Sequence, residues 1–228
     1  MTPGEIVTAF AYVVGLAVFL WAARRRKLAT TGVGWLVLWG LIGGLIGAKV
    51  TQLVAQGWFT VPDPRLGGRA LLGGVIGGWA AVEIAKRLMG IRRSTGDLFA
   101  LGLASGEAVG RIGCFLNGCC YGSICDLPWA VHQHGADRHP AQIYSAIVST
   151  AIFGVLLTQF RRGVVEGRVF RLYLILWAGS RFLLEFVRFR ETIFFGLSPI
   201  QWLCLEISVS LGVLGLVKRS RMAEQKGG

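Results

Sequence analysis

Reactive side chains are concentrated in one stretch of an otherwise apolar chain, RIGCFLNGCCYGSIC, residues 111–125. It holds four of the five cysteines beside an arginine and an asparagine. Thiols outside the cytoplasm can form disulfides, and an adjacent arginine favours a catalytic or acceptor thiolate. A metal site shared with nearby histidines is a further alternative, as are unreactive thiols. The C-x4-C-C-x4-C spacing is not that of a usual zinc pair, so no metal is predicted. The cysteines are Cys114, Cys119, Cys120 and Cys125.

Ionisable residues also occur inside apolar runs, where each costs about 2.5–3.5 kcal/mol at the bilayer centre. Glu107 and Arg111 are four residues apart, and so are Arg181 and Glu185, with Arg188 three residues further on. One interpretation is that each pair neutralises itself one helical turn apart. The other is that the arginines line a polar cavity, where their planar donors would hold an anionic phosphate.

Polar residues at two predicted helix starts complete the candidate site. In RHPAQIY, His139 precedes Pro140, and a histidine there can be a base, a hydrogen-bond donor or a structural residue. In LSPIQ, Ser198 can cap a helix whose first turn contains Pro199. The further candidates of this kind are Gln142, Tyr144 and Gln201, together with Lys49 inside an earlier apolar run.

The composition indicates which elements position these residues. Of the 228 residues, 54% are hydrophobic and 16% charged, and the mean hydropathy is +0.58. Soluble domains carry about 25% charged residues, so we predict an integral membrane protein. The net charge of +12 does not indicate nucleic-acid binding, because most cations lie in short clusters between apolar runs.

Seven apolar runs approach the length of about 20 residues that a membrane span needs. We therefore predict an all-α, polytopic membrane protein with about seven transmembrane helices, as a single domain over residues 1–228. Cations follow the first run rather than precede it, which predicts a retained span and not a signal peptide. Glycines four apart in the second and third runs predict close helix packing. The runs are 5–23, 33–56, 70–90, 97–116, 140–160, 169–188 and 196–217.

The distribution of cations predicts the orientation. Sixteen of the 24 lysines and arginines follow the first, third, fifth and seventh runs, which share one side if the runs alternate. The positive-inside rule makes that side cytoplasmic. The N-terminus is then outside, the C-terminus cytoplasmic, and the long connection 117–139 an external loop.

Four motifs in order carry a family resemblance. They are GRIGCFLNGCCYG (110–122), HPAQIY (139–144), RFLLEFVR (181–188) and LSPIQWL (197–203). Together they resemble the prolipoprotein diacylglyceryl transferase family, whose signatures are G-R-x-G-N-F-x-N-G-E-x-x-G, H-P-x-Q-L-Y, R-F-x-x-E-F-x-R and S-x-G-Q. The resemblance covers most of the chain.

The resemblance implies an enzyme of the bacterial inner membrane that works at its outer face without metal or organic cofactor. Such enzymes transfer the diacylglyceryl group of phosphatidylglycerol to the lipobox cysteine of a secreted preprotein, and glycerol phosphate leaves. Carried over by motif, the catalytic residues would be Arg111, Arg181, Glu185 and His139. The substrate-binding residues would be Lys49, Asn117, Gly122, Gln142, Tyr144, Arg188, Ser198 and Gln201.

The chain departs from the family pattern at several polar positions. Cys114 stands in place of an asparagine and Cys119 in place of a glutamate, while Leu72 and Ser145 replace a histidine and a glutamate. These departures leave a related acceptor, in place of a prolipoprotein, as one interpretation of the transferase, and two alternatives of other classes follow from them. One is a non-catalytic protein that binds or translocates anionic lipid, and the other is a membrane thiol-redox protein that uses the cysteines of residues 114–125.

Overall fold

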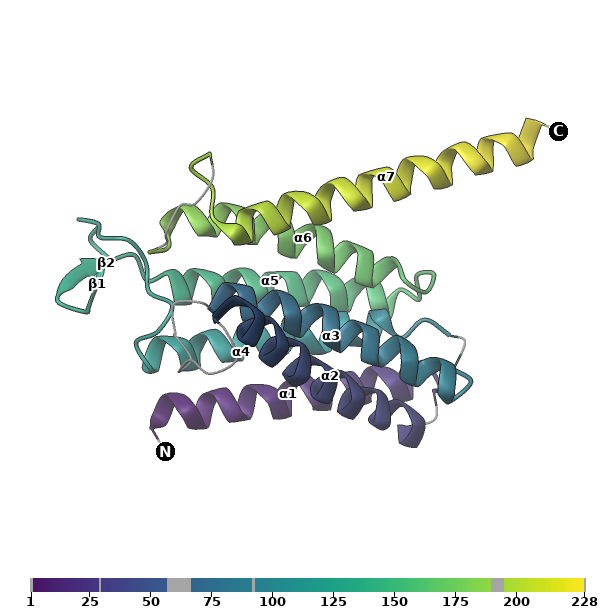
Figure 1. Ribbon diagram of the computed structural model, residues 1–228, viewed down its shortest axis with the longest axis horizontal. Helices are drawn as coiled ribbons and strands as arrows, with labels where there is room; N and C mark the ends of the chain where they lie inside the picture. The colour runs from purple at the N-terminus through teal and green to yellow at the C-terminus, as the bar shows by residue number, and fades with distance from the viewer. Residues whose placement is uncertain (1, 29, 57–66, 92, 190–194, 228) are drawn as a thin grey trace. The chain divides into compact units, whose positions relative to one another are not determined.

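A computed structural model describes residues 2–28, 30–56, 67–91, 93–189 and 195–227, and these residues are mostly helical (Figure 1). The only strands in these ranges form a short antiparallel hairpin, β1 (Val131–Gln133) and β2 (Ala136–Arg138). The prediction of an all-α membrane protein is confirmed at this level. The helices are α1 (Pro3–Arg25), α2 (Thr30–Gln56), α3 (Gly67–Leu88), α4 (Gly96–Leu116), α5 (Ala141–Arg161), α6 (Arg168–Leu184), the 3-10 helix η2 (Glu185–Val187) and α7 (Pro199–Gly227).

The helices coincide with the predicted apolar runs to within a few residues at most ends. In the part of the chain that the structure describes, α1, α4, α5 and residues 32–51 of α2 are long and apolar enough to cross a membrane. Helix α6 has only 17 residues and carries three arginines, which is short for a span. That all seven runs cross the membrane, and in which direction, stays a prediction.

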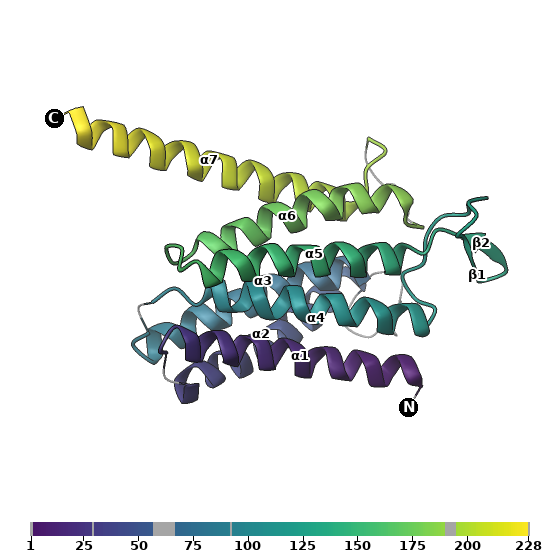
Figure 2. The same cartoon turned by 180° about the vertical axis from the view of Figure 1, so that it is seen from behind.

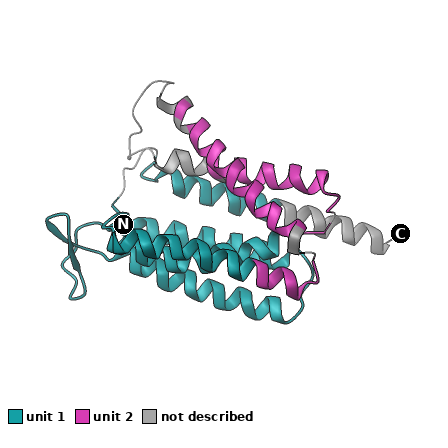
Figure 3. Ribbon diagram, turned by 90° about the horizontal axis from the view of Figure 1, so that it is seen from below, with its two compact units in different colours: residues 1–19, 95–228 teal, residues 20–94 magenta. Residues whose placement is uncertain are grey.

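The chain divides into two compact units, residues 1–19 with 95–228, and residues 20–94 (Figure 3). In the smaller unit, α2 and α3 pack through their glycines. A methyl group on Gly78 would lie 3.0 Å from the carbonyl oxygen of Gly40, and one on Gly74 would lie 3.4 Å from that of Gly44. Larger side chains would separate the two backbones, so the predicted close packing is confirmed.

The larger unit contains α4, α5, α6 and α7 with the hairpin, and the first part of α1. Helix α4 contacts α5 and α6, α5 also contacts α6, and α6 contacts α7 (Figures 1 and 2). Helix α1 follows α4 closely, since a methyl group on Gly15 would lie 2.9 Å from the carbonyl oxygen of Gly102. The rings of Phe19 and Phe99 extend this contact, with centroids 4.8 Å apart.

A buried carboxylate aligns the starts of α4 and α6. Asp97 accepts hydrogen bonds from the backbone N–H groups of Gly167 and Phe170, at 3.0 and 2.9 Å. A carboxylate at a helix N-terminus satisfies free donors and complements the helix dipole. Arg111 and Arg181 lie 14 residues beyond Asp97 and Gly167, respectively. At 1.5 Å per residue, both arginines are about 21 Å from these tied ends and therefore at the same level of the bundle.

Candidate functional site

Glu107 connects α4 to α6 and pairs with the first arginine. Its Oε1 accepts a hydrogen bond from Arg111 Nη2 at 2.7 Å, and its Oε2 accepts one from Trp177 Nε1 at 3.2 Å. The expected neutralisation within α4 is therefore present. Trp177 was not among the residues singled out from the sequence, because nothing in the sequence distinguishes an indole that faces a carboxylate from one that faces lipid.

Glu185 is the centre of a second charged group. Its Oε2 lies 3.0 Å from Arg181 Nη2 and 3.9 Å from Arg188 Nε, and its Oε1 accepts a hydrogen bond from Ser198 Oγ at 3.2 Å. Glu185 is only 6% exposed. A buried carboxylate between two arginines fixes both guanidinium groups, because either cation left alone would be costly to bury.

Ser198 and Gln201 form a reciprocal cap at the start of α7. The Gln201 N–H donates to Ser198 Oγ at 3.3 Å, and the Ser198 N–H donates to Gln201 Oε1 at 3.0 Å. Gln201 Nε2 also donates to the Phe182 carbonyl at the end of α6, at 3.2 Å. The predicted cap is confirmed. Both residues are buried, and Ser198 Oγ links the cap to Glu185.

Three guanidinium groups gather around these two carboxylates, and two of them have unused donors. Arg111 and Arg188 lie close enough to Arg181 for like-charge repulsion. Within the described residues, the buried atoms Arg111 Nε and Arg181 Nη1 have no hydrogen-bond acceptor. Buried donors are normally satisfied. Because the cations also outnumber the two carboxylates, an anion would complete this arrangement.

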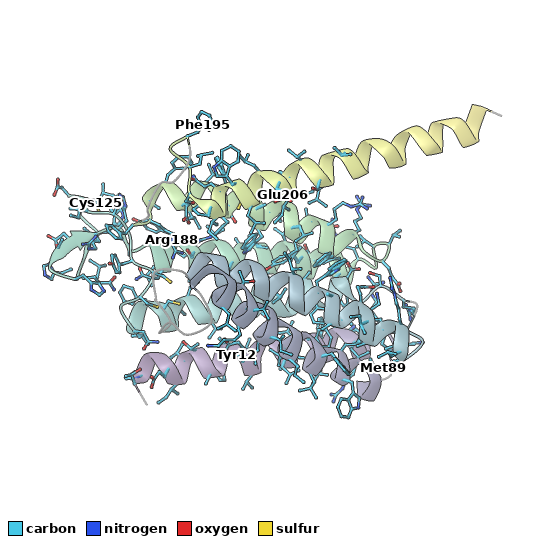
Figure 4. All side chains as sticks on the ribbon, viewed as in Figure 1. Tyr12, Met89, Cys125, Arg188, Phe195 and Glu206 are labelled. Atoms are coloured by element: carbon cyan, nitrogen blue, oxygen red, sulfur yellow. The ribbon has the colours of Figure 1, made fainter. Side chains whose placement is uncertain are left out.

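The sequence predicted an apolar span that extends to residue 188, but the helix ends before Arg188. Helix α6 ends at Leu184, and after η2 the backbone at Arg188 is extended, with φ −87° and ψ 149°. Arg188 pairs with Gly122 in an isolated β-bridge, and the Ser123 N–H donates to the Val187 carbonyl at 3.0 Å. Hydrogen bonds to the loop thus replace those that would continue the helix. In Figure 4, Arg188 and Cys125 are labelled near the hairpin end of the larger unit.

Arg138 holds this loop together and was missed from the sequence. Its Nη1 donates to the Gly122 carbonyl at 3.3 Å, and its Nε donates to the Gln133 carbonyl at 3.0 Å. The guanidinium also lies 4.8 Å from the ring centroid of Tyr121 and 5.5 Å from that of Phe189. The sequence feature that could have identified Arg138 is its position directly before the HPAQIY motif. These contacts indicate that Arg138 shapes the loop.

Gly122 is the point at which the loop meets the Arg188 segment. A methyl group here would contact the His139 carbonyl and lie 2.9 Å from the carbonyl oxygen of Val187. We therefore expect Gly122→Ala to displace Arg188 and lower any activity that needs it by at least about tenfold, equivalent to 1.4 kcal/mol. Gly154→Ala is the matched control, because a methyl group there meets no atom within 4 Å. Equal activities for the two variants would contradict this role of Gly122.

The cysteines separate into a group of three and two isolated residues. The Sγ atoms of Cys114, Cys119 and Cys120 all lie within 4.8 Å of one another. Cys125 lies in the following loop, where its N–H donates to the Asp137 carbonyl at 3.0 Å. All five thiols, including that of the buried Cys204, are free in the structure. The choice among disulfide, nucleophile and unreactive thiol is not made by this arrangement alone.

The thiols of Cys119 and Cys120 have different electrostatic surroundings. The pKa of Cys120 is lowered, first because the Cys114 thiol donates a hydrogen bond to its sulfur, and then because Arg188 lies beside it; burial opposes both. The pKa of Cys119 is raised, chiefly by burial and then by the charge of Cys120. Cys120 is therefore the more acidic thiol of the two.

Alkylation should show this difference. Below the ordinary thiol pKa of about 8.5, and above its own lowered pKa, Cys120 is a thiolate while Cys119 is protonated. We expect iodoacetamide to label Cys120 several-fold faster than Cys119 at mildly acidic pH, and the preference to disappear as the pH falls through the pKa of Cys120. Peptide mass spectrometry measures both rates. Denatured chain is the control, and a preference that persisted there would contradict the electrostatic cause.

Two of the remaining predicted site residues, His139 and Gln142, lie where the loop meets α5. Gln142 is buried and donates from Nε2 to the Cys119 carbonyl at 2.9 Å and to Gln133 Oε1 at 3.1 Å. The Nδ1 atom of His139 is buried without a partner in the described part of the chain, and its ring centroid lies 6.2 Å from that of Tyr144.

Two further predicted residues, Tyr144 and Asn117, have hydrogen-bond partners other than the arginines, and a third, Lys49, lies in the smaller unit. Tyr144 Oη accepts a hydrogen bond from Trp129 Nε1 at 2.6 Å. Asn117 Oδ1 accepts one from Thr2 Oγ1 at 3.0 Å, at the start of α1. Lys49 is exposed on α2, in the other compact unit, so its participation stays a prediction.

The fold and the site define an all-α membrane protein in which two arginines, each paired with a glutamate, keep one buried donor atom without an acceptor among the described residues. A model of the prolipoprotein diacylglyceryl transferase family matches residues 5–217. The chain therefore belongs to the prolipoprotein diacylglyceryl transferase family.

Similar proteins carry the name phosphatidylglycerol–prolipoprotein diacylglyceryl transferase. The one from Methylibium petroleiphilum is 31% identical over 93% of this chain and 90% of its own length. That from Clostridioides difficile is 30% identical over 80% of this chain and 77% of its own. That from Clostridium tetani is 32% identical over 65% of each chain.

Proposed function

We propose that this chain is a transferase that moves the diacylglyceryl group of phosphatidylglycerol to a cysteine thiol of a prolipoprotein. The observation that carries the proposal is the pair of unpartnered donors, Arg111 Nε and Arg181 Nη1, in a member of this family. A lipid phosphate would accept hydrogen bonds from both. The names of the relatives supply the two substrate classes.

The charges of the site suit the chemistry of this transfer. The thiolate sulfur of the acceptor attacks the glyceryl carbon that carries the phosphate, a new C–S bond forms, and the C–O bond to phosphate breaks. The electron pair of that bond stays on the departing glycerol phosphate. Fixed guanidinium groups at this position stabilise the charge as it develops, without reorganising during the reaction. Arg111 and Arg181 have that role, and Arg188 is held beside them through Glu185.

His139 is the proposed base for the acceptor thiol. Its buried Nδ1 has no partner among the described residues, so it can accept a proton. Gln142 and Tyr144 follow it on α5 and would border the acceptor site. Asn117 and Gly122 would shape the headgroup site from the α4 side, with Lys49 as a further cation. Ser198 and Gln201 would position Glu185.

The chain would carry out this reaction at the outer face of the bacterial inner membrane. The sequence supports seven spans, an outer N-terminus and a cytoplasmic C-terminus through its four cationic connections. The connection 117–139 would then face outward, where a secreted preprotein presents its lipobox cysteine. A single membrane domain is part of the same proposal.

The test is a transfer assay with the purified full-length chain in detergent. Labelled phosphatidylglycerol and a lipobox peptide should yield a lipidated peptide and an equal amount of glycerol phosphate. A peptide with serine in place of the acceptor cysteine is the control and should remain unmodified. Lipid binding without either product would instead favour the non-catalytic alternative and would refute the proposal.

A further inference from the structure

We propose that Cys114, Cys119 and Cys120 form a three-sulfur site for one soft, thiophilic metal ion, with Cu(I) as the preferred occupant. This is a binding site beyond the transfer reaction. Family members commonly carry asparagine and glutamate at two of these positions, so the site would belong to this chain's own departures. The three sulfurs come from the end of α4 and the turn that follows it.

The backbone folds the consecutive cysteines back toward the helix. Gly118 and Cys120 both have left-handed conformations, with φ of 65° and 61°. The Cys119 N–H donates to the Cys114 carbonyl at 3.1 Å, which closes the turn. A non-glycine residue with positive φ is uncommon, so the surrounding contacts must hold Cys120 in place. The chain thus places Cys119 and Cys120 beside the sulfur of Cys114.

The sulfur spacing is close to that of a metal site. Metal–sulfur bonds of about 2.3 Å in a trigonal arrangement separate the sulfurs by about 4.0 Å. The three Sγ atoms already lie within 4.8 Å of one another. The largest contraction needed is therefore about 1 Å, which side-chain rotation can supply. Cys119 and Cys120 are exposed, so an ion can reach them.

The neighbouring charges favour thiolates bound to a cation. Arg111 interacts electrostatically with Cys114 and Cys120, and Arg188 donates a hydrogen bond to Cys120. Three thiolates with one Cu(I) carry two net negative charges. The adjacent group of three arginines and two glutamates has a net charge of +1, which offsets part of them. The same thiolates without nearby cations would be costly to hold together.

The ligand set favours Cu(I) over Zn(II). Thiolates are soft ligands that suit both ions, but a structural zinc site needs four protein ligands. Cys125 is not within the three-sulfur group. His134 uses its Nε2 in a 2.6 Å hydrogen bond with the Gly118 carbonyl, and no histidine of the described residues belongs to the three-sulfur group. Three sulfurs alone complete a trigonal Cu(I) site.

Metal binding would also regulate the site, a consequence that rests on the proposed function. A metal on the three sulfurs would recruit Arg111 and Arg188 to offset its charge. The same guanidinium groups would then be less available to a lipid phosphate. We therefore expect the copper-loaded chain to transfer diacylglyceryl groups more slowly than the copper-free chain.

The binding test uses the full-length chain in detergent, kept reduced by a phosphine under anaerobic conditions. Cu(I) buffered by a competing chelator should bind at one ion per chain and produce an ultraviolet sulfur-to-copper absorption band. Cys119→Ser and Cys120→Ser should each weaken binding by more than about 100-fold, beyond the cost of losing an outer-shell contact. Cys125→Ser is the matched control and should bind like the native chain.

Two results would overturn the site. One is Cu(I) affinity in Cys119→Ser and Cys120→Ser equal to that of the native chain. The other is an equal loss in Cys125→Ser, which would place the copper elsewhere. Circular dichroism on the same samples establishes that each variant is folded.

The transfer assay separates this proposal from the proposed function. Copper should slow transfer by the native chain and by Cys125→Ser, but not by Cys119→Ser. Copper binding with unchanged transfer would refute the regulatory consequence. An absence of transfer by the copper-free native chain would refute the proposed function instead, while the binding result would still decide the metal site.

Discussion

Replacing Arg181 with lysine is expected to lower the rate of diacylglyceryl transfer by about two to three orders of magnitude, the usual cost of losing one fixed donor to a developing oxyanion. Lysine retains the charge but not the planar fork of donors. Arg181 Nη2 is engaged by Glu185, while Nη1 is buried and unpartnered. One side chain therefore has to contact a carboxylate and a phosphate together, which a single ammonium group cannot do in the same geometry.

The measurement is the initial rate with labelled phosphatidylglycerol, over a range of lipid concentrations. A fall in kcat larger than any rise in KM is expected, because the contact strengthens as the phosphate leaves. Arg171→Lys, on an exposed turn of the same helix, is the matched control. If Arg181→Lys retained a rate within a few-fold of Arg171→Lys, Arg181 would not contact the leaving group.

Replacing Glu185 with glutamine is expected to destabilise the chain by about 3 kcal/mol, the scale of leaving a buried charge uncompensated. Glutamine preserves the shape of the side chain and can still accept the hydrogen bond from Ser198 Oγ. It removes the negative charge that lies 3.0 Å from Arg181 and 3.9 Å from Arg188. The two guanidinium groups would then repel each other with no carboxylate between them.

Thermal unfolding in detergent measures the loss of stability, and the transfer assay below the unfolding range measures activity. Both should fall, because the same carboxylate balances the charges and holds the arginines in place. Glu206→Gln on α7 makes the identical change at an exposed position and should alter neither quantity. A Glu185→Gln variant as stable as Glu206→Gln would show that Arg181 and Arg188 do not depend on this carboxylate.

The Arg181 and Glu185 variants test different interactions. Arg181 contributes through a donor that the fold leaves unused, whereas Glu185 contributes through the charges that it balances. Ser198 and Gln201 act one step further away, through the cap that places Ser198 Oγ 3.2 Å from Glu185. A kinetic variant at Ser198 would therefore test positioning rather than contact with lipid.

Several features of the site could be predicted from local sequence alone. The Glu107–Arg111 and Arg181–Glu185 pairs follow from four-residue spacing, since such residues lie on one helix face. The Ser198–Gln201 cap follows from the S-x-x-Q pattern beside Pro199. Each depends on only one helical turn, so it needs no knowledge of the neighbouring helices.

Other features depend on residues that are distant in the chain. The Trp177–Glu107 hydrogen bond joins two helices, and the Arg138–Gly122 contact joins the two ends of one loop. Arg188 lies on extended backbone because the loop competes with the helix for its hydrogen bonds. A pattern of residue types does not reveal which of two possible partners forms the hydrogen bond in the folded chain.

The cysteines show the same division. Their spacing left disulfides, a metal site, a catalytic or acceptor thiol and unreactive thiols as alternatives. The left-handed turn at Gly118 and Cys120 brings three sulfurs together and leaves Cys125 apart. The turn also sets Cys120 beside Arg188, which arrives from a segment more than sixty residues away.

The sequence by itself determined that the chain is a helical membrane protein with seven apolar segments and a recognisable set of motifs. These properties are local, because a run of apolar residues and a motif can be identified without any packing partner. Only the tertiary structure decided which donors of Arg111 and Arg181 are left unpartnered, where α6 stops, and which thiols meet. The unused donors and the end of α6 depend on partners that are far apart in the chain, in the packing of α4 against α6 and in the loop that bonds to Arg188. The thiols meet because of the left-handed turn at Gly118 and Cys120, whose backbone conformation the residue types do not specify.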